Sequence, residues 1–199
     1  MWRANRLWLE GMTRLISEAK VITVFGSSRP GEATDEYGLA RRLGGELARA
    51  GFAVLSGGYG GVMEAVSRWA SEAGGHVIGI TADQLSTGAN RWVAEQVRVK
   101  TWRERLFALI DRGDGYVACK GGTGTLVELA VVWEMLNKGV MGAKPFVALG
   151  DFWRPILERV REVEVGHPSP WGEANNWLIR VAPTPEEAAA YLARQLTVR

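Results

Sequence analysis

The chain has 199 residues, of which 47% are hydrophobic and 23% charged, as is ordinary for a soluble globular protein of one domain. Lysine and arginine number 24 against 22 acidic residues, and no basic run of five or more appears, so the charge pattern argues against nucleic-acid binding. The one cysteine, Cys119, excludes an internal disulfide framework and fits a reducing compartment.

The first 20 residues have apolar side chains at helical spacing, which predicts an amphipathic helix before the first strand. Arginine and glutamate interrupt this segment, so it lacks the apolar centre of a signal peptide. No stretch of the chain approaches the roughly 20 apolar residues that a membrane-spanning helix needs. We therefore expect a cytoplasmic protein without a membrane partner.

Seven short apolar runs bounded by turn residues follow along the chain and predict strands. Several are apolar at consecutive positions, which is typical of parallel strands whose two faces are both covered by helices. The runs are "VITVF" (21–25), "FAVLS" (52–56), "HVIGI" (76–80), "QVRV" (96–99), "GYVAC" (115–119), "PFVAL" (145–149) and "WLIRV" (177–181).

Segments between these runs have the spacing and end signals of helices. The last one begins at Thr184, where Pro185 and Glu187 complete the pattern of a capping box. Alternating strands and helices predict an α/β fold, with an open, doubly wound, mostly parallel sheet of about seven strands and helices on both faces. We expect one domain over 1–199. Other predicted helices lie within 35–51, 60–75 and 101–115.

Three of the predicted strands end in turns rich in glycine and hydroxyl residues. Such turns also occur for tight packing alone, but three at one sheet edge suggest a phosphorylated ligand. The carboxyl ends of parallel strands share the edge where ligands bind. Glycine lets a ligand approach backbone N–H groups, and a helix N-terminus favours an anion. The turns contain Gly26, Ser27 and Ser28; Gly57, Gly58, Gly60 and Gly61; and Gly121, Gly122, Thr123, Gly124 and Thr125.

The spacing of these glycines argues against two common nucleotide-binding motifs. Gly58-x-Gly60 is followed by Met63 where a dinucleotide fingerprint needs a third glycine, and the later turn fails in the same way. Lys120 precedes its glycines and cannot take the place of a P-loop lysine. Ordinary dinucleotide binding and triphosphate hydrolysis are therefore both unsupported.

A carboxylate and a guanidinium are candidates for chemistry beside the third turn. Glu128 lies in the first turn of the following helix, where Thr125-x-x-Glu128 also has the spacing of a capping box. Arg105 comes from the helix after the fourth strand, and by itself this position favours a solvated side chain over a catalytic one. Together they could break a glycosidic bond beside a phosphate site, with Glu128 activating water or stabilising an oxocarbenium-like centre.

The apolar stripe of the Glu128 helix predicts which side of that helix faces the sheet. Glu128 lies off this stripe, close to the glycine turn. The stripe consists of Leu126, Leu129, Ala130, Trp133 and Leu136.

The remaining reactive side chains do not form a recognisable site. The two histidines, His76 and His167, are isolated and have no metal-ligand spacing. Cys119 has no histidine in a recognisable partner position, and we interpret it as a small core residue. We expect no metal site.

Four motifs together resemble the LOG family, long mislabelled as possible lysine decarboxylases. They are "VFGSSRPG", "SGGYGGVMEAV", "WRER" and "GGTGTLVE". The best-known members are cytokinin riboside 5′-monophosphate phosphoribohydrolases. The similarity covers roughly residues 20 to 192, and the family hallmark P-G-G-x-G-T-x-x-E is present as Lys120-Gly-Gly-Thr-Gly-Thr-Leu-Val-Glu128.

This resemblance implies a Rossmann-like fold, a homodimer or higher homo-oligomer, and Arg105 and Glu128 as the catalytic pair. The implied reaction is hydrolysis of the N-glycosidic bond of an AMP-like nucleoside 5′-monophosphate to free base and ribose 5-phosphate. No metal or organic cofactor is implied. The implied substrate-binding residues are Gly26, Ser27, Gly57, Gly58, Met63, Gly121, Gly122, Thr123, Gly124 and Thr125.

Two departures from the family pattern favour a second hypothesis. Lys120 replaces the proline of the hallmark, and Leu106 replaces a lysine that often follows the catalytic arginine. The chain is also similar to a bacterial branch of the family and to molybdenum-cofactor carrier proteins. The alternative function is therefore a carrier that binds a nucleotide or the molybdenum cofactor without cleaving it. No lysine is placed convincingly for a pyridoxal phosphate Schiff base, so the decarboxylase label is unsupported.

Overall fold

A computed structural model describes residues 19–85, 88–166 and 178–197. Within these ranges, seven strands form one sheet in the order β4-β3-β2-β1-β5-β6-β7, and every neighbouring pair is parallel. The predicted helix over 1–20 falls almost wholly outside the described residues, as does Trp177 of the last predicted strand. The strands are β1 (Val21–Phe25), β2 (Ala53–Ser56), β3 (Val77–Ala82), β4 (Glu95–Val99), β5 (Gly115–Ala118), β6 (Phe146–Leu149) and β7 (Ile179–Ala182).

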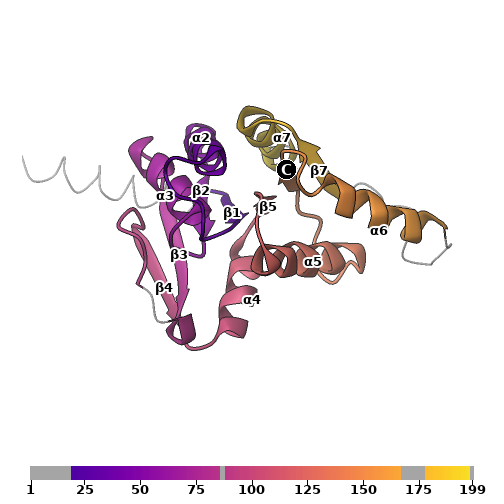
Figure 1. The fold of residues 1–199 in the computed structure, drawn as a ribbon, viewed down its shortest axis with the longest axis horizontal. Coiled ribbons are helices and arrows are strands. Elements are labelled where there is room, and N and C mark those ends of the chain that lie inside the picture. The colour runs from indigo at the N-terminus through magenta and orange to yellow at the C-terminus, as the bar shows by residue number, and fades with distance from the viewer. Residues whose placement is uncertain (1–18, 86–87, 167–177, 198–199) are drawn as a thin grey trace, which may run out of the picture.

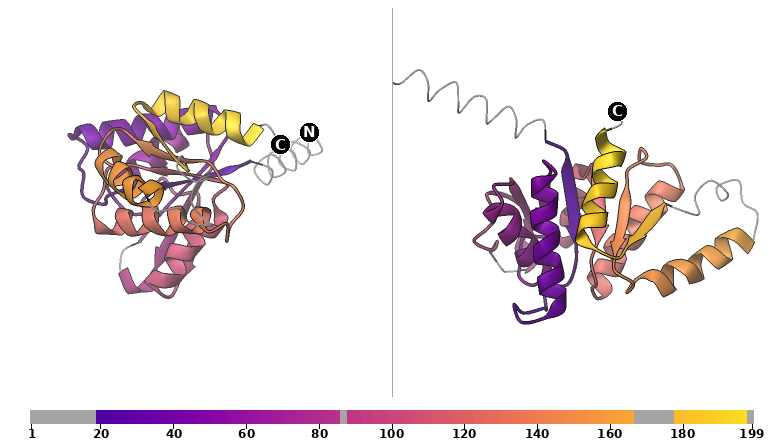
Figure 2. Two further views of the ribbon diagram at one scale, coloured as in Figure 1. Left: turned by 90° about the vertical axis from the view of Figure 1, so that its right-hand side faces the viewer. Right: turned by 90° about the horizontal axis from the view of Figure 1, so that it is seen from above.

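Helices cover both faces of the sheet, which confirms the predicted α/β, doubly wound, Rossmann-like fold (Figure 1). Helices α2, α3 and α7 pack on one face, where α2 contacts both of its neighbours (Figure 2). Helices α4, α5 and α6 pack on the other. The helices are α2 (Asp35–Arg49), α3 (Val62–Glu72), α4 (Trp102–Arg112), α5 (Thr123–Asn137), α6 (Arg154–Gly166) and α7 (Pro185–Thr197), with a short 3₁₀ turn η1 (Asp83–Leu85).

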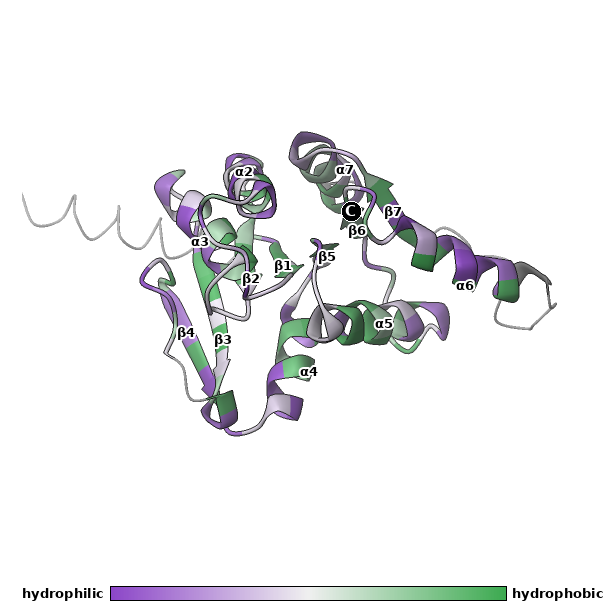
Figure 3. Cartoon of the chain, in the orientation of Figure 1, coloured by the Kyte–Doolittle hydropathy of each residue, from purple (hydrophilic) through white to green (hydrophobic). Residues whose placement is uncertain are grey.

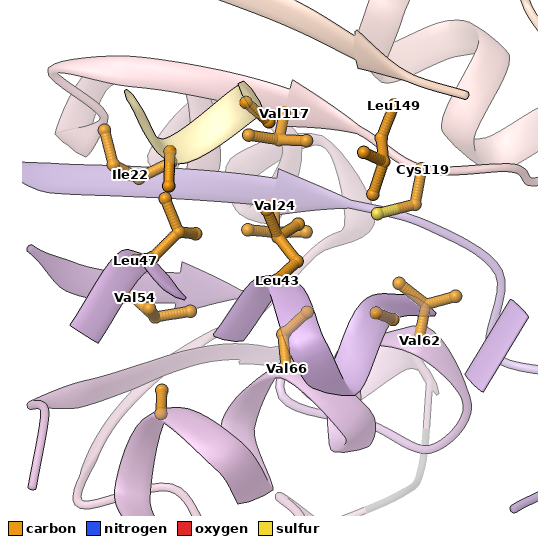
Figure 4. Close-up of a cluster of buried hydrophobic side chains, with 14 of the residues drawn as sticks. Ile22, Val24, Leu43, Leu47, Val54, Val62, Val66, Val117, Cys119 and Leu149 are labelled. Atoms are coloured by element: carbon orange, nitrogen blue, oxygen red, sulfur yellow. The ribbon is translucent and has the colours of Figure 1, made fainter. Parts of the chain in front are cut away.

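Burial on both faces explains why the central strands are apolar at consecutive positions. Every residue of β2, β3, β5 and β6 is buried, whereas the edge strand β4 is largely exposed on its sequence "EQVRV". On the α2 face, Val24 of β1 and Val117 of β5 lie in one cluster with Leu43 and Leu47 of α2 (Figure 4). Cys119 belongs to this cluster, as predicted, and burial raises the pKa of its thiol to about 12.

The strand order reverses between β1 and β5. From β1 the chain proceeds outward through β2, β3 and β4, and it then returns to β5 before proceeding through β6 and β7 on the other side. In open α/β sheets the crevice beyond the carboxyl ends of the strands at such a reversal is the usual place for a ligand. The turns after β1 and β5, which begin at Gly26 and Cys119, therefore border this crevice.

The prediction for the α5 stripe is partly wrong. Leu129, Trp133 and Leu136 are buried, but Leu126 is 37% exposed and Ala130 is exposed as well. The helix is apolar nearly all round, so its hydrophobic residues do not by themselves define one buried side (Figure 3). Among the described residues, no helix combines the length and the apolar character needed to cross a membrane.

Candidate active site

A cavity of about 550 Å³ lies at the carboxyl edge of the sheet, where the turns after β1, β2 and β5 meet the starts of α4 and α5. Segments that are up to a hundred residues apart in the chain therefore contribute to one site. The cavity is lined by Gly26, Ser27, Ser28, Arg29, Tyr59, Met63, Leu85, Arg105, Gly122, Thr123, Gly124, Thr125 and Glu128.

The start of α5 forms one wall of the cavity and carries backbone N–H groups without intrahelical partners. Gly122 is the N-cap residue, and no side chain among the described residues caps it. The first N–H bonded back into the helix is that of Leu126, which donates to the Gly122 carbonyl over 2.9 Å. Because the preceding N–H groups have no helical acceptor, this end of α5 suits an anion such as phosphate.

The capping-box interpretation of Thr125 and Glu128 is wrong. Helix α5 begins at Thr123, so Thr125 lies inside its first turn, where its side chain is buried. Gly121 packs directly against it, since a Cβ at Gly121 would lie 2.2 Å from Thr125 Oγ1. The close contact explains why glycine occupies this position, which does not itself line the cavity.

Arg105 and Glu128 come together in the cavity from two different helices. Arg105 Nη1 lies 4.0 Å from Glu128 Oε1, and the two side chains are only 8% and 14% exposed. That separation is longer than a hydrogen bond, so the two groups interact through charge. The sequence hypothesis that α4 brings an arginine to the carboxylate beside the third glycine turn agrees with this geometry.

The guanidinium of Arg105 is fixed by the surrounding backbone and side chains. Its Nε donates a hydrogen bond of 2.8 Å to the Ile80 carbonyl, and its Nη2 lies 3.8 Å from Met63 Sδ. Tyr59 lies beneath it, with the guanidinium carbon 5.0 Å from the ring centroid. These contacts hold the group at the floor of the cavity rather than in solvent.

Two glycines of the second turn shape the site from below instead of lining it. Gly57 makes room for Arg105, because a Cβ there would lie 1.6 Å from Arg105 Nη2. Gly58 has a φ of 74°, which favours glycine, and its N–H donates to Ser56 Oγ over 3.1 Å. Direct ligand contact by Gly57 and Gly58 stays a prediction. Their observed role is to form the turn and admit the guanidinium.

Burial changes the protonation of the two charged groups. It raises the pKa of Glu128 to about 7 because the carboxylate loses water, and the charge of Arg105 only partly opposes this effect. Burial also lowers the pKa of Arg105, against the opposing influence of Glu128. Glu128 is therefore a carboxyl group that can both hold and release a proton near neutral pH.

Three cavity residues, Arg29, Tyr59 and Leu85, were absent from the predicted site. Arg29 follows the predicted turn Gly26–Ser28, so its proximity to that turn was a usable signal. Tyr59 interrupts the glycines of the second turn, and an aromatic residue in such a turn is a weaker signal. Leu85 comes from η1, and nothing in its local sequence indicates the cavity.

The two residues that depart from the family pattern, Lys120 and Leu106, do not line the cavity. Lys120 forms an ion pair with Glu36 of α2 and lies over the ring of Phe152, 5.8 Å from its centroid. Leu106 is packed in the core on the α4 face. The described residues contain no group of three or more His, Cys, Asp or Glu side chains arranged to hold a metal ion.

Comparisons with known proteins agree with this fold and with the motifs. Residues 19–160 match the model of the SLOG cluster4 family. The chain is 29% identical over 152 residues to the cytokinin riboside 5′-monophosphate phosphoribohydrolase of Rhodococcoides fascians, covering 73% of this chain and 76% of that protein. A protein of Oryza sativa subsp. japonica, named as a probable enzyme of the same activity, is 32% identical over 187 residues, which is 90% of this chain and 72% of the relative.

A solved structure is similar over nearly the whole fold. It is that of the molybdenum cofactor binding protein of the phototrophic bacterium Rippkaea orientalis. The TM-score is 0.71 at 25% identity, and the alignment covers 90% of this chain and 98% of that one. The similar proteins thus include both named phosphoribohydrolases and a named cofactor-binding protein.

Proposed function

The chain belongs to the SLOG cluster4 family, and from this premise we propose that it hydrolyses the N-glycosidic bond of a nucleoside 5′-monophosphate, with Arg105 and Glu128 as catalytic residues. The observation that carries the proposal is their separation of 4.0 Å in a cavity whose wall is the uncapped start of α5. The helix start in that cavity suits a phosphate, and Glu128, further along the same helix, offers a carboxyl group. A nucleotide monophosphate has the matching order of phosphate, sugar and base.

In the proposed reaction, the backbone N–H groups at the start of α5 bind the 5′-phosphate, and Glu128 lies beside the ribose. The bond between C1′ and the base nitrogen breaks as positive charge develops on the sugar, which a carboxylate stabilises. Glu128 accepts a proton from the attacking water, whose oxygen bonds to C1′; the departing base nitrogen takes up a proton from solvent, to which Glu128 then releases its own. The products are the free base and ribose 5-phosphate.

Arg105 has two roles in this proposal. Its charge keeps a fraction of Glu128 ionised near neutral pH despite burial, because a nearby cation lowers the pKa of a carboxyl group. Arg105 also lines the cavity, where in this proposal its guanidinium holds an oxygen of the substrate. The proposed hydrolysis therefore requires Arg105 as well as Glu128.

The test is base release from a panel of nucleoside 5′-monophosphates, followed by chromatography. We expect the parent protein to release base from at least one of them, while Glu128→Gln and Arg105→Gln lose that activity. The corresponding nucleosides, which lack the phosphate, serve as control substrates and should react poorly. Release of base by the variants at the parental rate would contradict the assignment of the catalytic pair.

A second candidate function is a carrier that holds a nucleotide or the molybdenum cofactor without cleaving it. The similarity to the Rippkaea orientalis protein favours it, since it extends over 98% of that chain. A carrier needs the anion-binding start of α5 but not the carboxyl group of Glu128. Tight binding of a nucleotide or of the cofactor by parent and Glu128→Gln protein alike, with no base released, would support the carrier over the enzyme.

We also propose that the protein is a homodimer that pairs through the outer side of α5. Leu126 and Ala130 are exposed there, and Phe107 of the neighbouring α4 is 38% exposed. A second copy of this apolar surface would cover it. Light scattering of the eluted protein should give the mass of a dimer, and Ala130→Arg should give a monomer, whereas Glu158→Arg on α6 should not. A monomeric parent protein would contradict this part of the proposal.

A further inference from the structure

The guanidinium of Arg105 lies over the ring of Tyr59, and both residues line the cavity. The guanidinium carbon is 5.0 Å from the ring centroid, within the range in which an aromatic face attracts a cation. The attraction is stronger where water is excluded, and the side chain of Arg105 is only 8% exposed. Tyr59 is thus an electrostatic contact of the guanidinium as well as a packing contact.

The hydrogen bond from Arg105 to the backbone does not by itself fix the guanidinium. Its Nε donates to the Ile80 carbonyl, which defines one point of the group. The two Nη atoms can still tilt about that point. Met63 Sδ, 3.8 Å from Nη2, limits the tilt on one side, and the Tyr59 ring covers another. With both in place, Nη1 is directed toward Glu128.

Tyr59 is itself held at both its side chain and its backbone. The Ala82 N–H of β3 donates to the Tyr59 hydroxyl oxygen over 2.9 Å. The side-chain amide of Asn90 donates to the carbonyls of Gly58 and Tyr59, over 3.1 and 3.0 Å, and the Asn90 backbone N–H donates to the Gly58 carbonyl over 2.7 Å. A residue from the connection before β4 thereby fixes the turn that carries the ring.

We propose that Tyr59 is a positioning residue, whose anchored ring holds the guanidinium of Arg105 at a fixed separation from Glu128. The inference rests on the proposed function for its catalytic meaning, but the contact it describes exists without substrate. Replacing the ring with an aliphatic side chain frees the guanidinium to tilt away from the carboxyl group. The hydroxyl group, by contrast, is needed only to anchor the ring.

The charged groups around this contact come from three elements. Arg105 of α4 acts on Glu128 of α5, and both Glu128 and Tyr59 of the second glycine turn act on Arg105. Arg29, after β1, lines the same cavity. Because the positive charge of Arg105 favours the ionised carboxylate, any movement of the guanidinium away from Glu128 must raise the pKa of that carboxyl group.

The experiment is a pH titration of the Glu128 carboxyl group by carbon-13 NMR, on protein labelled at the glutamate side chains and without any ligand. The Glu128 signal is assigned by its disappearance in Glu128→Gln. Parent, Tyr59→Phe and Tyr59→Leu proteins are compared, with Tyr191→Leu as a matched control. The control removes a similar pair elsewhere, in which the Arg180 guanidinium carbon lies 5.3 Å from the Tyr191 ring centroid.

The proposal predicts a raised Glu128 pKa in Tyr59→Leu, a smaller change in Tyr59→Phe because the ring remains, and no change in Tyr191→Leu. A Glu128 pKa in Tyr59→Leu equal to the parental value would overturn it. Should Tyr59→Leu fail to fold, Tyr59→Met, with an unbranched side chain of similar length, provides the same comparison.

Kinetics supply a second measurement. In Tyr59→Leu we expect kcat to fall roughly 10- to 100-fold, the size expected for a catalytic group displaced by about 1 Å, with less change in KM. The rise of kcat with pH should shift to higher pH together with the Glu128 pKa. If no nucleotide is cleaved, the proposed function fails on that result alone, and the carboxyl titration still decides whether Tyr59 positions Arg105.

Discussion

The starts of α4 and α5 share the pattern Thr-x-x-Glu and differ in nearly everything else. At the start of α4, Thr101 Oγ1 accepts the Glu104 N–H, and Glu104 Oε2 accepts the Thr101 N–H, so the capping box is complete. At the start of α5, Thr125 lies within the helix and Glu128 turns toward Arg105. Glu104 completes a capping box, whereas the carboxyl group of Glu128 remains available for catalysis.

The electrostatic consequences of the two arrangements are opposite. Hydrogen bonds from the backbone at Thr101 and Lys100 lower the pKa of Glu104, while burial raises the pKa of Glu128 to about 7. The difference arises because α5 begins at Thr123, with Gly122 as its N-cap, which moves Thr125 out of the capping position. Equal spacing therefore gives unequal roles, and where the helix begins decides between them.

The largest difference between Glu128 and Glu104 is expected in the effect of their substitution on nucleotide hydrolysis. If Glu128 acts as a general base, Glu128→Gln should lower kcat for nucleotide hydrolysis by roughly 10²- to 10⁴-fold, the usual contribution of such a group. Glu104→Gln should retain activity and lose less than about 1 kcal/mol of stability, because glutamine at this position still completes a capping box. Steady-state kinetics and urea unfolding of both variants measure this. Equal losses of activity in Glu128→Gln and Glu104→Gln would contradict a specific catalytic role of Glu128.

The stability of the protein should depend on pH in a way that Glu128→Gln removes. The folded state raises the pKa of Glu128 from 4.5 to about 7, so it favours the neutral carboxyl group. This contribution to stability is complete below pH 4.5 and is lost as the pH rises through about 7, at a cost of up to about 3 kcal/mol.

Urea unfolding at several pH values tests that expectation. Glu128→Gln should exceed the parent in free energy of unfolding at about pH 8, where the parental carboxyl group is ionised, with the gap closing toward pH 4. Comparison of the two proteins at each pH cancels the titration of other groups. A gap that does not vary with pH would mean that burial does not control the protonation of Glu128.

Gly57, which packs against Arg105, should be the next most sensitive position after the catalytic pair. Gly57→Ala would place a methyl group 1.6 Å from the present position of Arg105 Nη2, so the guanidinium must move. We expect kcat to fall roughly 10- to 100-fold, as for other displacements of about 1 Å. Gly60→Ala is the control in the same turn, because its nearest contact would be the Ser28 carbonyl at an ordinary 3.7 Å. Full activity of Gly57→Ala would contradict the steric argument.

The smallest effect is expected from a substitution that makes the start of α5 resemble that of α4. Gly122→Asp supplies an N-cap acceptor, which should stabilise the protein by roughly 0.3 kcal/mol in thermal unfolding, because glycine is itself a tolerated N-cap residue. The new negative charge should also weaken nucleotide binding, measured by calorimetry. Gly122→Ala adds a methyl group with nothing within 4 Å and supplies no acceptor, so it should not stabilise the helix. Tighter nucleotide binding by Gly122→Asp would contradict an anion site at this helix start.

The sequence by itself determined the fold, because strand patterning is a local property. Strands buried on both faces must be apolar at consecutive positions, and each observed strand agrees with its predicted run to within two residues. The glycine turns likewise identified the sheet edge that carries the cavity. The family hallmark contains Glu128, and the resemblance added Arg105 from the motif "WRER", although the helices that carry the two residues are separate in the chain.

Only the tertiary structure decided which face each helix presents and what surrounds each charged group. Helix α5 is apolar nearly all round, so packing against the sheet, rather than its pattern, buries Leu129 and exposes Leu126. Tyr59 reaches Arg105, and Asn90 reaches the turn that carries Tyr59, through contacts between distant segments. The burial of Glu128 and its distance from Arg105 depend on such contacts, and both control the pKa of Glu128. Because these contacts join segments that are far apart in the chain, they cannot be derived from local sequence patterns.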